Sequence, residues 1–411
     1  MREMLPRRSE KKRRISEKKI SVQQIAVLIG ACLYQCAMIG ILLNCSGVLF
    51  AQIRQELGFT MSRVSVYNTM KSVTTALAAA SVTALYFKSR KPIFLLLNQL
   101  LTITGFLLLT VGAEGSLWYV SAVICGFSGC VGSVAIPILL TLWFPDNSGT
   151  ATGIAMSFSG IGGAICNPLC ARLINSMGWK SAIYVLSAVT LALTIPGLLL
   201  MFHRPAPEGN APEKKKIQSP SGRMKVGTVV LVAVVLVGGS LGVTFAVNIS
   251  MFAQSIGYSL AIGASMTTMI MIGNVCSKFL YGLFCDKVGV WKATIGALAV
   301  AMAALLCYLF ASGQTAALFA ASLLYGCVYA LSVVGISRCC IAAYGQQESK
   351  RYLGVHTCIN SIVMAGASLL VGVLVDCFGS FMPVLLTVFG SMACSMAACL
   401  LLTKQQIKQA D

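Results

Sequence analysis

Four basic residues stand inside long apolar stretches of this 411-residue sequence, where a charged side chain is costly. They are Lys71, Lys278, Arg338 and His356, whereas no Asp or Glu falls inside any of these stretches. A charge at the middle of a bilayer costs about 2.5–3.5 kcal/mol on insertion scales, so such residues commonly mark a transport pathway. Because no carboxylate within the stretches can neutralise these cations, an anion that enters from outside would supply the missing charge. The four residues therefore predict a site for a small organic anion.

Lys71 and Lys278 are expected to face one central cavity from opposite sides and to hold the anion jointly. Lys71 lies about 13 Å of helical rise from one end of its stretch, and Lys278 lies about 12 Å from one end of its own. We read these values as similar depths in the membrane. One dicarboxylate could bridge both ammonium groups, and a monocarboxylate could engage them in turn. Lys278 could instead pack through a partly extended stem, an interpretation that fits the more central Lys71 less well.

The other two basic residues lie closer to the membrane surface and have structural alternatives. Arg338 stands about 9 Å from the end of its stretch and could extend its guanidinium to the lipid head groups. His356 is similarly shallow and could simply form a hydrogen bond within the helix bundle. A role for His356 in proton coupling stays open, because histidine titrates near neutral pH.

Uncharged polar residues within the apolar stretches are weaker candidates for the cavity wall, since such side chains often serve as hydrogen-bonding contacts between helices. These candidates are Tyr34, Gln35, Asn44, Asn167, Asn248 and Asn360. No glycine-rich phosphate loop follows a strand, so we expect no nucleotide cofactor. The 17 cysteines include no CxxC pair, and we expect neither a metal nor a disulfide.

Composition identifies the elements that must position these residues. The sequence is 57% hydrophobic and 10% charged, whereas about a quarter of the residues in soluble domains are charged. Apolar runs of 18 or more residues predict transmembrane helices. We predict an all-α membrane protein with spans at 22–50, 62–87, 92–112, 117–144, 149–174, 181–202, 226–252, 259–285, 292–311, 316–344, 353–375 and 381–403.

An internal repeat divides these twelve predicted helices into two halves. Phe50-Ala-Gln recurs as Phe252-Ala-Gln, and Asn175-Ser-Met-Gly178 recurs as Asp376-Cys-Phe-Gly379. The expected organisation is a basic N-terminal segment (1–21), a six-helix bundle (22–202), a linker (203–225), a second six-helix bundle (226–403) and a C-terminal segment (404–411). Transporters built from two such repeats bind their substrate between the halves.

Basic residues predict the orientation. Most of the 31 Lys and Arg residues fall in segments on the side of both termini, which the positive-inside rule places in the cytoplasm. We expect a multi-pass protein of the plasma membrane, monomeric, with basic segments near anionic lipid head groups. Nothing in the sequence supports nucleic-acid binding.

One connection between predicted helices carries a recognisable motif. Gly282-Leu-Phe-Cys-Asp286-Lys287-Val-Gly289-Val-Trp-Lys292 resembles the signature loop of the major facilitator superfamily. The junction from Trp143-Phe-Pro145 to Gly153-Ile-Ala155 resembles that of its monocarboxylate and oxalate–formate antiporter-like branch. The resemblance implies twelve helices in two pseudo-symmetric halves. It also implies a conformational latch formed by Gly282, Asp286, Lys287, Gly289 and Lys292.

The expected function is therefore secondary transport of a small organic anion, a mono- or dicarboxylate, by alternating access. Antiport or facilitated transport is favoured, because exchange of anions needs no titrating residue in the protein. Drug or metabolite efflux within the same superfamily remains an alternative, although a cationic drug would require an acidic residue facing the cavity. A non-transporting membrane sensor is a further alternative. No enzymatic activity is expected.

For the loop motif, Asp286 stands at the end of a predicted helix, where the helix dipole disfavours a negative charge. Its expected partner, in one conformation, is the start of the predicted helix near Gly149 to Ala151. Simple solvation of the carboxylate in the loop is the alternative.

Overall fold

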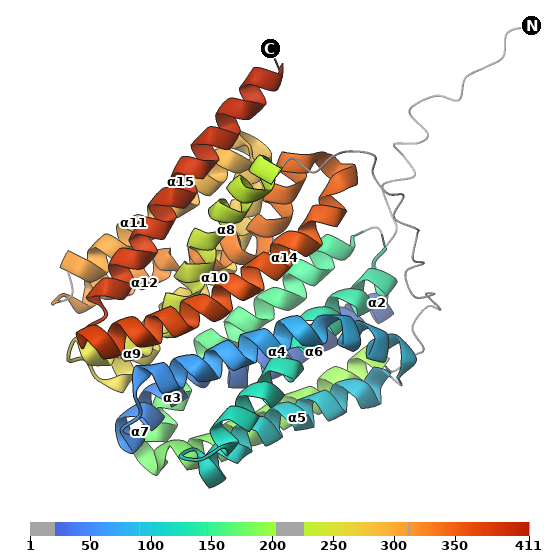
Figure 1. Ribbon diagram of the computed structural model, residues 1–411. Helices are drawn as coiled ribbons and strands as arrows, with labels where there is room; N and C mark the ends of the chain where they lie inside the picture. Colours follow the sequence, from blue (N-terminus) through green and yellow to red (C-terminus); the bar gives the residue numbers. More distant parts are fainter. Residues whose placement is uncertain (1–20, 90, 146, 203–225, 311–312, 411) are drawn as a thin grey trace, which may run out of the picture.

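The computed structural model describes residues 21–89, 91–145, 147–202, 226–310 and 313–410 (Figure 1). The segment 1–20 of the expected basic N-terminal region and the expected linker 203–225 lie outside the described residues. The described residues are almost entirely helical, and no strand occurs among them. The predicted all-α fold with two six-helix halves is confirmed.

The first half begins with one membrane helix made of α2 (Val22–Gln35), η1 (Cys36–Leu43) and α3 (Asn44–Leu57). It continues with α4 (Met61–Lys88), α5 (Lys91–Gly112) and α6 (Leu117–Trp143). The element α7 (Ser148–Phe202) comprises two membrane helices that meet at Gly178, whose φ of 81° interrupts the helical conformation. A residue with a side chain rarely adopts such a φ, which explains glycine at this junction.

The second half repeats this order. Its first membrane helix consists of α8 (Val226–Val247) and α9 (Ile249–Ser255), followed by α10 (Leu260–Val288) and α11 (Val290–Phe310). The next comprises α12 (Thr315–Tyr325), α13 (Cys327–Ala330), η2 (Leu331–Gly335) and the start of α14 (Ile336–Phe378). At Gly345, with a φ of 77°, α14 turns into the eleventh membrane helix. The helix α15 (Met382–Ala410) is the twelfth.

Ten segments among the described residues are long and apolar enough to cross a membrane. One of them, 149–202, contains the two helices that meet at Gly178, and the more polar α4 adds another helix of 28 residues. Successive membrane helices therefore run in opposite directions between two faces of the protein. We name the face at which α2 begins and α15 ends the terminal face, and the opposite face the distal face.

Matching helix caps mark the repeat. Thr60 accepts a hydrogen bond from the backbone N–H of Arg63 at the start of α4 (3.3 Å). Ser259 accepts one from Ile262 at the start of α10 (3.4 Å). Each cap satisfies an N–H group that has no partner within its own helix. These equivalent positions provide a common origin for measuring depth along the two helices.

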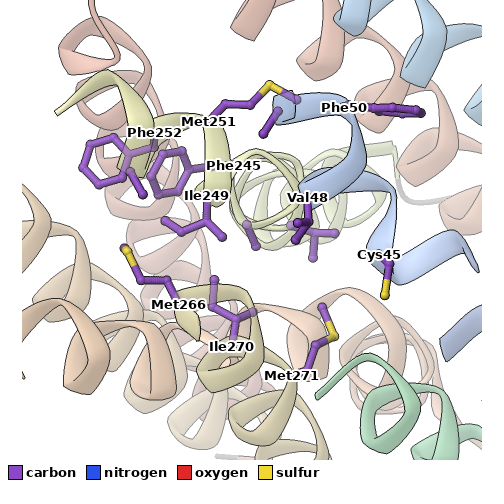
Figure 2. Close-up of a cluster of buried hydrophobic side chains, with 14 of the residues drawn as sticks. Cys45, Val48, Phe50, Phe245, Ile249, Met251, Phe252, Met266, Ile270 and Met271 are labelled. Carbon is purple, nitrogen blue, oxygen red and sulfur yellow. The ribbon is translucent and has the colours of Figure 1, made fainter. Parts of the chain in front are cut away.

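The halves pack against each other through the pairs α4 with α14 and α10 with α7; the first pair lies side by side in Figure 1. Between them, buried hydrophobic side chains of α3, α9 and α10 form one continuous cluster that includes Val48, Ile249, Met251, Ile270 and Met271 (Figure 2). The distal half of the protein is therefore a closed, apolar contact between the two bundles.

Candidate functional site

Lys71 lies on the side of α4 that is turned away from the membrane. The carbonyl oxygen of Lys71 and that of Gly126 on α6 both accept a hydrogen bond from Thr75 Oγ1 (2.9 and 2.8 Å). The highly exposed Val73 and Leu77 lie about 120–160° around the helix from Lys71, at 100° per residue. The Lys71 side chain is half-buried, which fits a position at the interior of the bundle rather than in lipid.

Lys278 occupies a comparable face of α10. A Cβ atom on Gly160 of α7 would lie 2.7 Å from Val275 Cγ2 and 3.4 Å from the carbonyl oxygen of Met271, so these residues face the other half. Lys278 lies within about 60° of both around the helix, whereas the exposed Ile272 and Leu280 lie about 120–160° away. The half-buried Lys278 therefore lies on the same face of α10 as this contact between the halves, one helical turn closer to the terminal face.

The expectation that the two lysines share one depth is wrong. Lys71 is 11 residues beyond the cap Thr60, and Lys278 is 19 residues beyond the equivalent cap Ser259. The difference of eight residues corresponds to about 12 Å along the helix axis. Lys71 therefore lies on the distal side of the membrane centre and Lys278 on the terminal side. A single anion at one level of the membrane would therefore not lie beside both ammonium groups.

Neither lysine has a charge partner within the described part of the chain. No hydrogen bond or ion pair joins either ammonium group to a described residue. Polar residues accompany both: Asn68 precedes Lys71 by three residues, and Asn274 precedes Lys278 by four. The side-chain oxygen of each asparagine is buried without a hydrogen-bond partner among the described residues. Neither asparagine was predicted as a site residue, although the helical spacing places each on the same face as its lysine.

Asn44 lies where the two halves meet. Its Nδ2 donates to the Ser159 carbonyl (2.8 Å). A Cβ on Gly163 would lie 3.1 Å from Asn44 Cβ and 3.3 Å from Met271 Cγ. Asn44 therefore borders the contact between the halves two helical turns distal to Lys278, and its amide also holds the first helix against α7.

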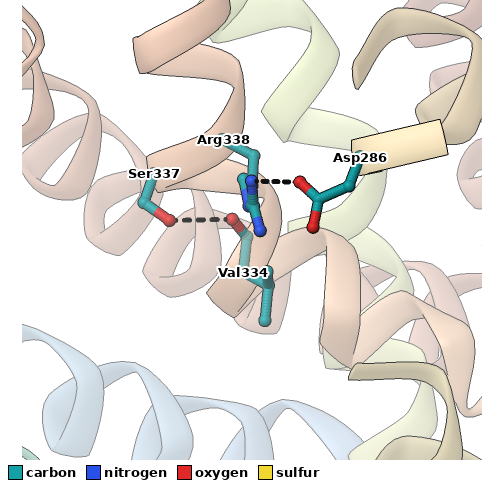
Figure 3. A network of polar contacts seen from close by, with 4 residues as sticks. All are labelled: Asp286, Val334, Ser337 and Arg338. Atoms are coloured by element: carbon teal, nitrogen blue, oxygen red, sulfur yellow. Dashed lines mark hydrogen bonds and ion pairs between the residues drawn. The ribbon is translucent and has the colours of Figure 1, made fainter. Parts of the chain in front are cut away.

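Arg338 has a partner that the sequence analysis did not foresee. Its Nη1 lies 2.8 Å from Asp286 Oδ1, in an ion pair between α14 and the end of α10 (Figure 3). The two side chains are 37% and 62% exposed, so this is a pair at the surface of the terminal face. The prediction that no carboxylate neutralises these cations is thus wrong for Arg338. In this structure Arg338, and not the start of α7, holds Asp286.

Other predicted cavity residues bind within their own half. Tyr34 donates to the Leu95 carbonyl of α5 (3.1 Å), and Gln35 donates to the Gly132 carbonyl of α6 (3.0 Å). His356 is fully buried, and its Nε2 lies 2.9 Å from the hydroxyl of Tyr344, which stacks on the imidazole. These three residues connect helices of the same bundle.

Three asparagines complete the predicted set. Asn248 donates to the Thr244 carbonyl (2.8 Å) at the break between α8 and α9. Asn360 accepts a hydrogen bond from Ser240 of α8. Asn167 is fully buried, with no hydrogen-bond partner for its amide among the described residues. No group of three metal-ligating side chains occurs in the described ranges, and the described cysteines are free.

The distal face carries the polar contacts between the halves. Asp376, near the end of α14, accepts hydrogen bonds from the backbone N–H groups of Met61 (2.8 Å) and Ser62 (2.7 Å) at the start of α4. Thr69 donates to the Ala365 carbonyl (2.9 Å), and Gln254 Nε2 lies 3.3 Å from Gln55 Oε1. Every inter-half hydrogen bond between two described residues lies at or distal to the membrane centre. The structure is therefore closed at the distal face.

Comparison with known proteins places this geometry in a family. A family model described as Major Facilitator Superfamily matches residues 32–367, more than half of the chain. Two solved structures share the fold: a mutant of the nucleoside transporter NupG and a bacterial homologue of the human lysosomal transporter Spinster, the latter inward-facing and unoccupied. Their TM-scores are 0.68 and 0.65 at 14% and 13% identity, and the matches cover 92% and 93% of this chain and 99% and 95% of those chains.

Two curated relatives match shorter segments. A protein described as the probable sulfoacetate transporter SauU of Cupriavidus necator is 32% identical over 112 residues, which are 22% of this chain and 25% of that protein. The probable transporter MCH2 of Saccharomyces cerevisiae is 24% identical over 213 residues, 50% of this chain and 44% of that protein. The matches thus span less than half the length of each relative.

Proposed function

Because the chain belongs to the Major Facilitator Superfamily and is a multi-pass membrane transporter, we propose that its substrate is a small organic anion. Mono- and dicarboxylates fit the proposal, as does a sulfonate of similar size. Lys71 and Lys278 carry it, because each is directed to the interior of the bundle and has no charge partner in the described part of the chain. A substrate carboxylate would neutralise the ammonium and form charge-assisted hydrogen bonds with it.

The depth of the two lysines suggests an order of contacts. With the distal face closed, an anion that enters from the terminal face reaches Lys278 first and then Lys71, about 12 Å deeper by helical rise. Asn274 and Asn68 have donor groups one turn beyond each lysine and would assist at the two positions. A small monocarboxylate would therefore engage Lys278 and Lys71 in turn. This order of contacts favours successive binding over a dicarboxylate that bridges both lysines.

The side and mode of transport belong to the same proposal. The excess of Lys and Arg in the segments on the side of both termini supports a cytoplasmic location of that side in a plasma membrane, and hence a state closed toward the outside in this structure. Anion exchange or facilitated transport by a monomer, without a cofactor, requires no titrating group in the path. His356 is bound to Tyr344 inside its bundle, which supports this preference over proton symport.

The relatives add one chemical indication. The name of the Cupriavidus necator relative refers to sulfoacetate, a small organic anion, in line with the two lysines. The resemblance of the 143–155 junction to the monocarboxylate and oxalate–formate antiporter-like branch points the same way. The solved structures support the fold alone, since they are 13–14% identical to this chain.

Uptake into proteoliposomes tests the proposal. The purified full-length protein is reconstituted, and entry of radiolabelled formate, lactate, oxalate and sulfoacetate is compared with entry of uridine and of a lipophilic cation. We expect uptake of at least one anion above that of empty liposomes, and acceleration when the liposomes are preloaded with the same anion. Uptake of uridine or of the cation, with no anion transported, would overturn the proposal.

A further inference from the structure

A long apolar groove lies on the second half, away from the lysine path. It runs between α10, α11 and the α12–α13 segment and encloses a volume of about 560 Å³. Its walls include Leu280, Phe284, Val300 and Leu324. Volumes of about 300–1,000 Å³ are typical of sites for small molecules, so the groove can accommodate a substantial ligand.

The groove opens toward the lipid and not toward the interior. Leu280, Phe284 and Leu324 are 48%, 53% and 49% exposed although they are large and apolar. On α10, Leu280 lies about 160° around the helix from Lys278. In a chain that spans a membrane, such exposed apolar side chains contact acyl chains. The groove is therefore separate from the proposed substrate path, and the inference drawn from it does not depend on the substrate.

The length and the charge of the groove match one lipid molecule. Its wall on α10 extends from Gly273 to Val288, about 22 Å by helical rise, and one leaflet of a bilayer, head groups included, is about 20–22 Å thick. Lys292 is the one charged residue in its lining and stands at the terminal-face end. Lys287 is exposed one residue before the end of α10. The neighbouring Asp286 is bound to Arg338.

We propose that this groove is a specific site for a phospholipid with an anionic head group. One acyl chain fills the apolar groove, and Lys292, assisted by Lys287, binds the phosphate at the level of the head groups. Attraction of basic residues to anionic lipid contributes about 1 kcal/mol for each Lys near the surface, so two lysines distinguish an anionic from a zwitterionic lipid by roughly tenfold or more in occupancy.

Gly296 allows the groove to be closed by mutation. It belongs to the groove lining, and a Cβ atom added there meets no other atom within 4 Å. Gly296→Leu therefore adds apolar volume to the groove from a position where a Cβ atom meets no obstacle, and it also replaces a poor helix former. Gly390→Leu on α15 is the matched control, because Gly390 has equally open surroundings outside the groove.

Photo-crosslinking with lipids tests the proposal. The full-length protein is placed in phosphatidylcholine nanodiscs that contain a trace of phosphatidylglycerol with a diazirine in its acyl chain, or of phosphatidylcholine with the same label. Adducts are mapped by mass spectrometry. We expect phosphatidylglycerol adducts to concentrate at residues 273–300 and 323–330 and to exceed phosphatidylcholine adducts there about tenfold.

The variants separate the two parts of the site. Gly296→Leu should reduce the adducts in these segments at least fivefold, whereas Gly390→Leu should leave them unchanged; Val300→Trp is a second filling variant should the first fail to fold. Combined Lys287→Gln and Lys292→Gln should lower the phosphatidylglycerol yield to that of phosphatidylcholine. Equal yields of the two lipids in the parent protein, or an undiminished yield after filling the groove, would overturn the proposal.

Discussion

The carboxylate of Asp376 accepts hydrogen bonds from the backbone N–H groups of Met61 and Ser62 at 2.8 and 2.7 Å. The end of a helix in one half thereby caps the start of a helix in the other. A carboxylate at a helix N-terminus is favoured both by these free N–H groups and by the helix dipole. This contact therefore contributes to the closed distal face, and it is lost when that face opens.

Replacing Asp376 should shift the protein toward a distal-open state. Asp376 is exposed to water. We therefore expect its replacement to destabilise the distal-closed state relative to the distal-open state by about 1 kcal/mol, roughly a factor of five in the ratio of their populations. Hydrogen exchange measured by mass spectrometry should show faster exchange at the amides of Met61 and Ser62 in Asp376→Ala and a smaller effect in Asp376→Asn. Glu114→Gln removes a charge on the same face and should leave this exchange unchanged. Equal exchange in all variants would show that Asp376 does not stabilise closure.

Gly372 offers a steric test of the same closure. A Cβ atom on Gly372 would lie 2.7 Å from Ser62 Cα and from Ser65 Cβ across the interface. Overpacking of this kind typically costs about 1–3 kcal/mol, and separation of α4 and α14 relieves it. We expect Gly372→Ala to increase the fraction of distal-open particles in electron cryomicroscopy several-fold. Gly366→Ala on the same helix has open surroundings and should not change that fraction.

The pair of Asp286 and Arg338 should matter more for transport than for stability. Exposed ion pairs contribute about 0–1 kcal/mol, and both side chains are more than one-third exposed. We expect Asp286→Ala and Arg338→Ala to change the free energy of unfolding by less than about 1 kcal/mol while reducing uptake. A double-mutant cycle on uptake rates should show that the double variant loses less than the sum of the single effects. Additive losses would mean that the pair is not the functional unit.

Helix positions were predictable because the bilayer imposes a minimum apolar length on each span. The expected α4 span of 62–87 compares with Met61–Lys88 in the structure, and that of 117–144 with Leu117–Trp143 for α6. The breaks at Gly178 and Gly345 were likewise anticipated as connections between spans. The π-helical segments η1 and η2 were not predicted, because backbone hydrogen bonding of this kind depends on packing against neighbouring helices.

The site was harder to predict because depth and contact are properties of the folded chain. The depth of Lys71 was measured from the distal end of its helix, and the depth of Lys278 from the terminal end of its own helix. Similar distances from opposite ends give different depths in helices of 28 and 29 residues. Arg338 lacks a carboxylate within its own span, but Asp286 reaches it from the end of another helix. The neutral Asn68 and Asn274 were absent from the predicted polar candidates, although each lies within one helical turn of its lysine.

The two lysines, finally, should be distinguishable by substitution. Lys71→Gln and Lys278→Gln each remove one ammonium and should reduce uptake of the transported anion at least tenfold, the equivalent of about 1.4 kcal/mol or more. Lys→Arg at each position retains the positive charge and should partly preserve uptake. Lys88→Gln, the same change at the exposed end of the Lys71 helix, should have no effect on uptake.

The depth difference adds a further expectation. Binding from the terminal face with the distal face closed requires Lys278 first, so Lys278→Gln should lower the affinity for the anion measured by calorimetry more than Lys71→Gln does. Lys71→Gln should mainly slow exchange across the membrane, because the deeper position is reached later. Undiminished uptake of every transported anion by the Lys71→Gln variant would remove this lysine from the path, and the proposed anion site would then rest on Lys278 alone.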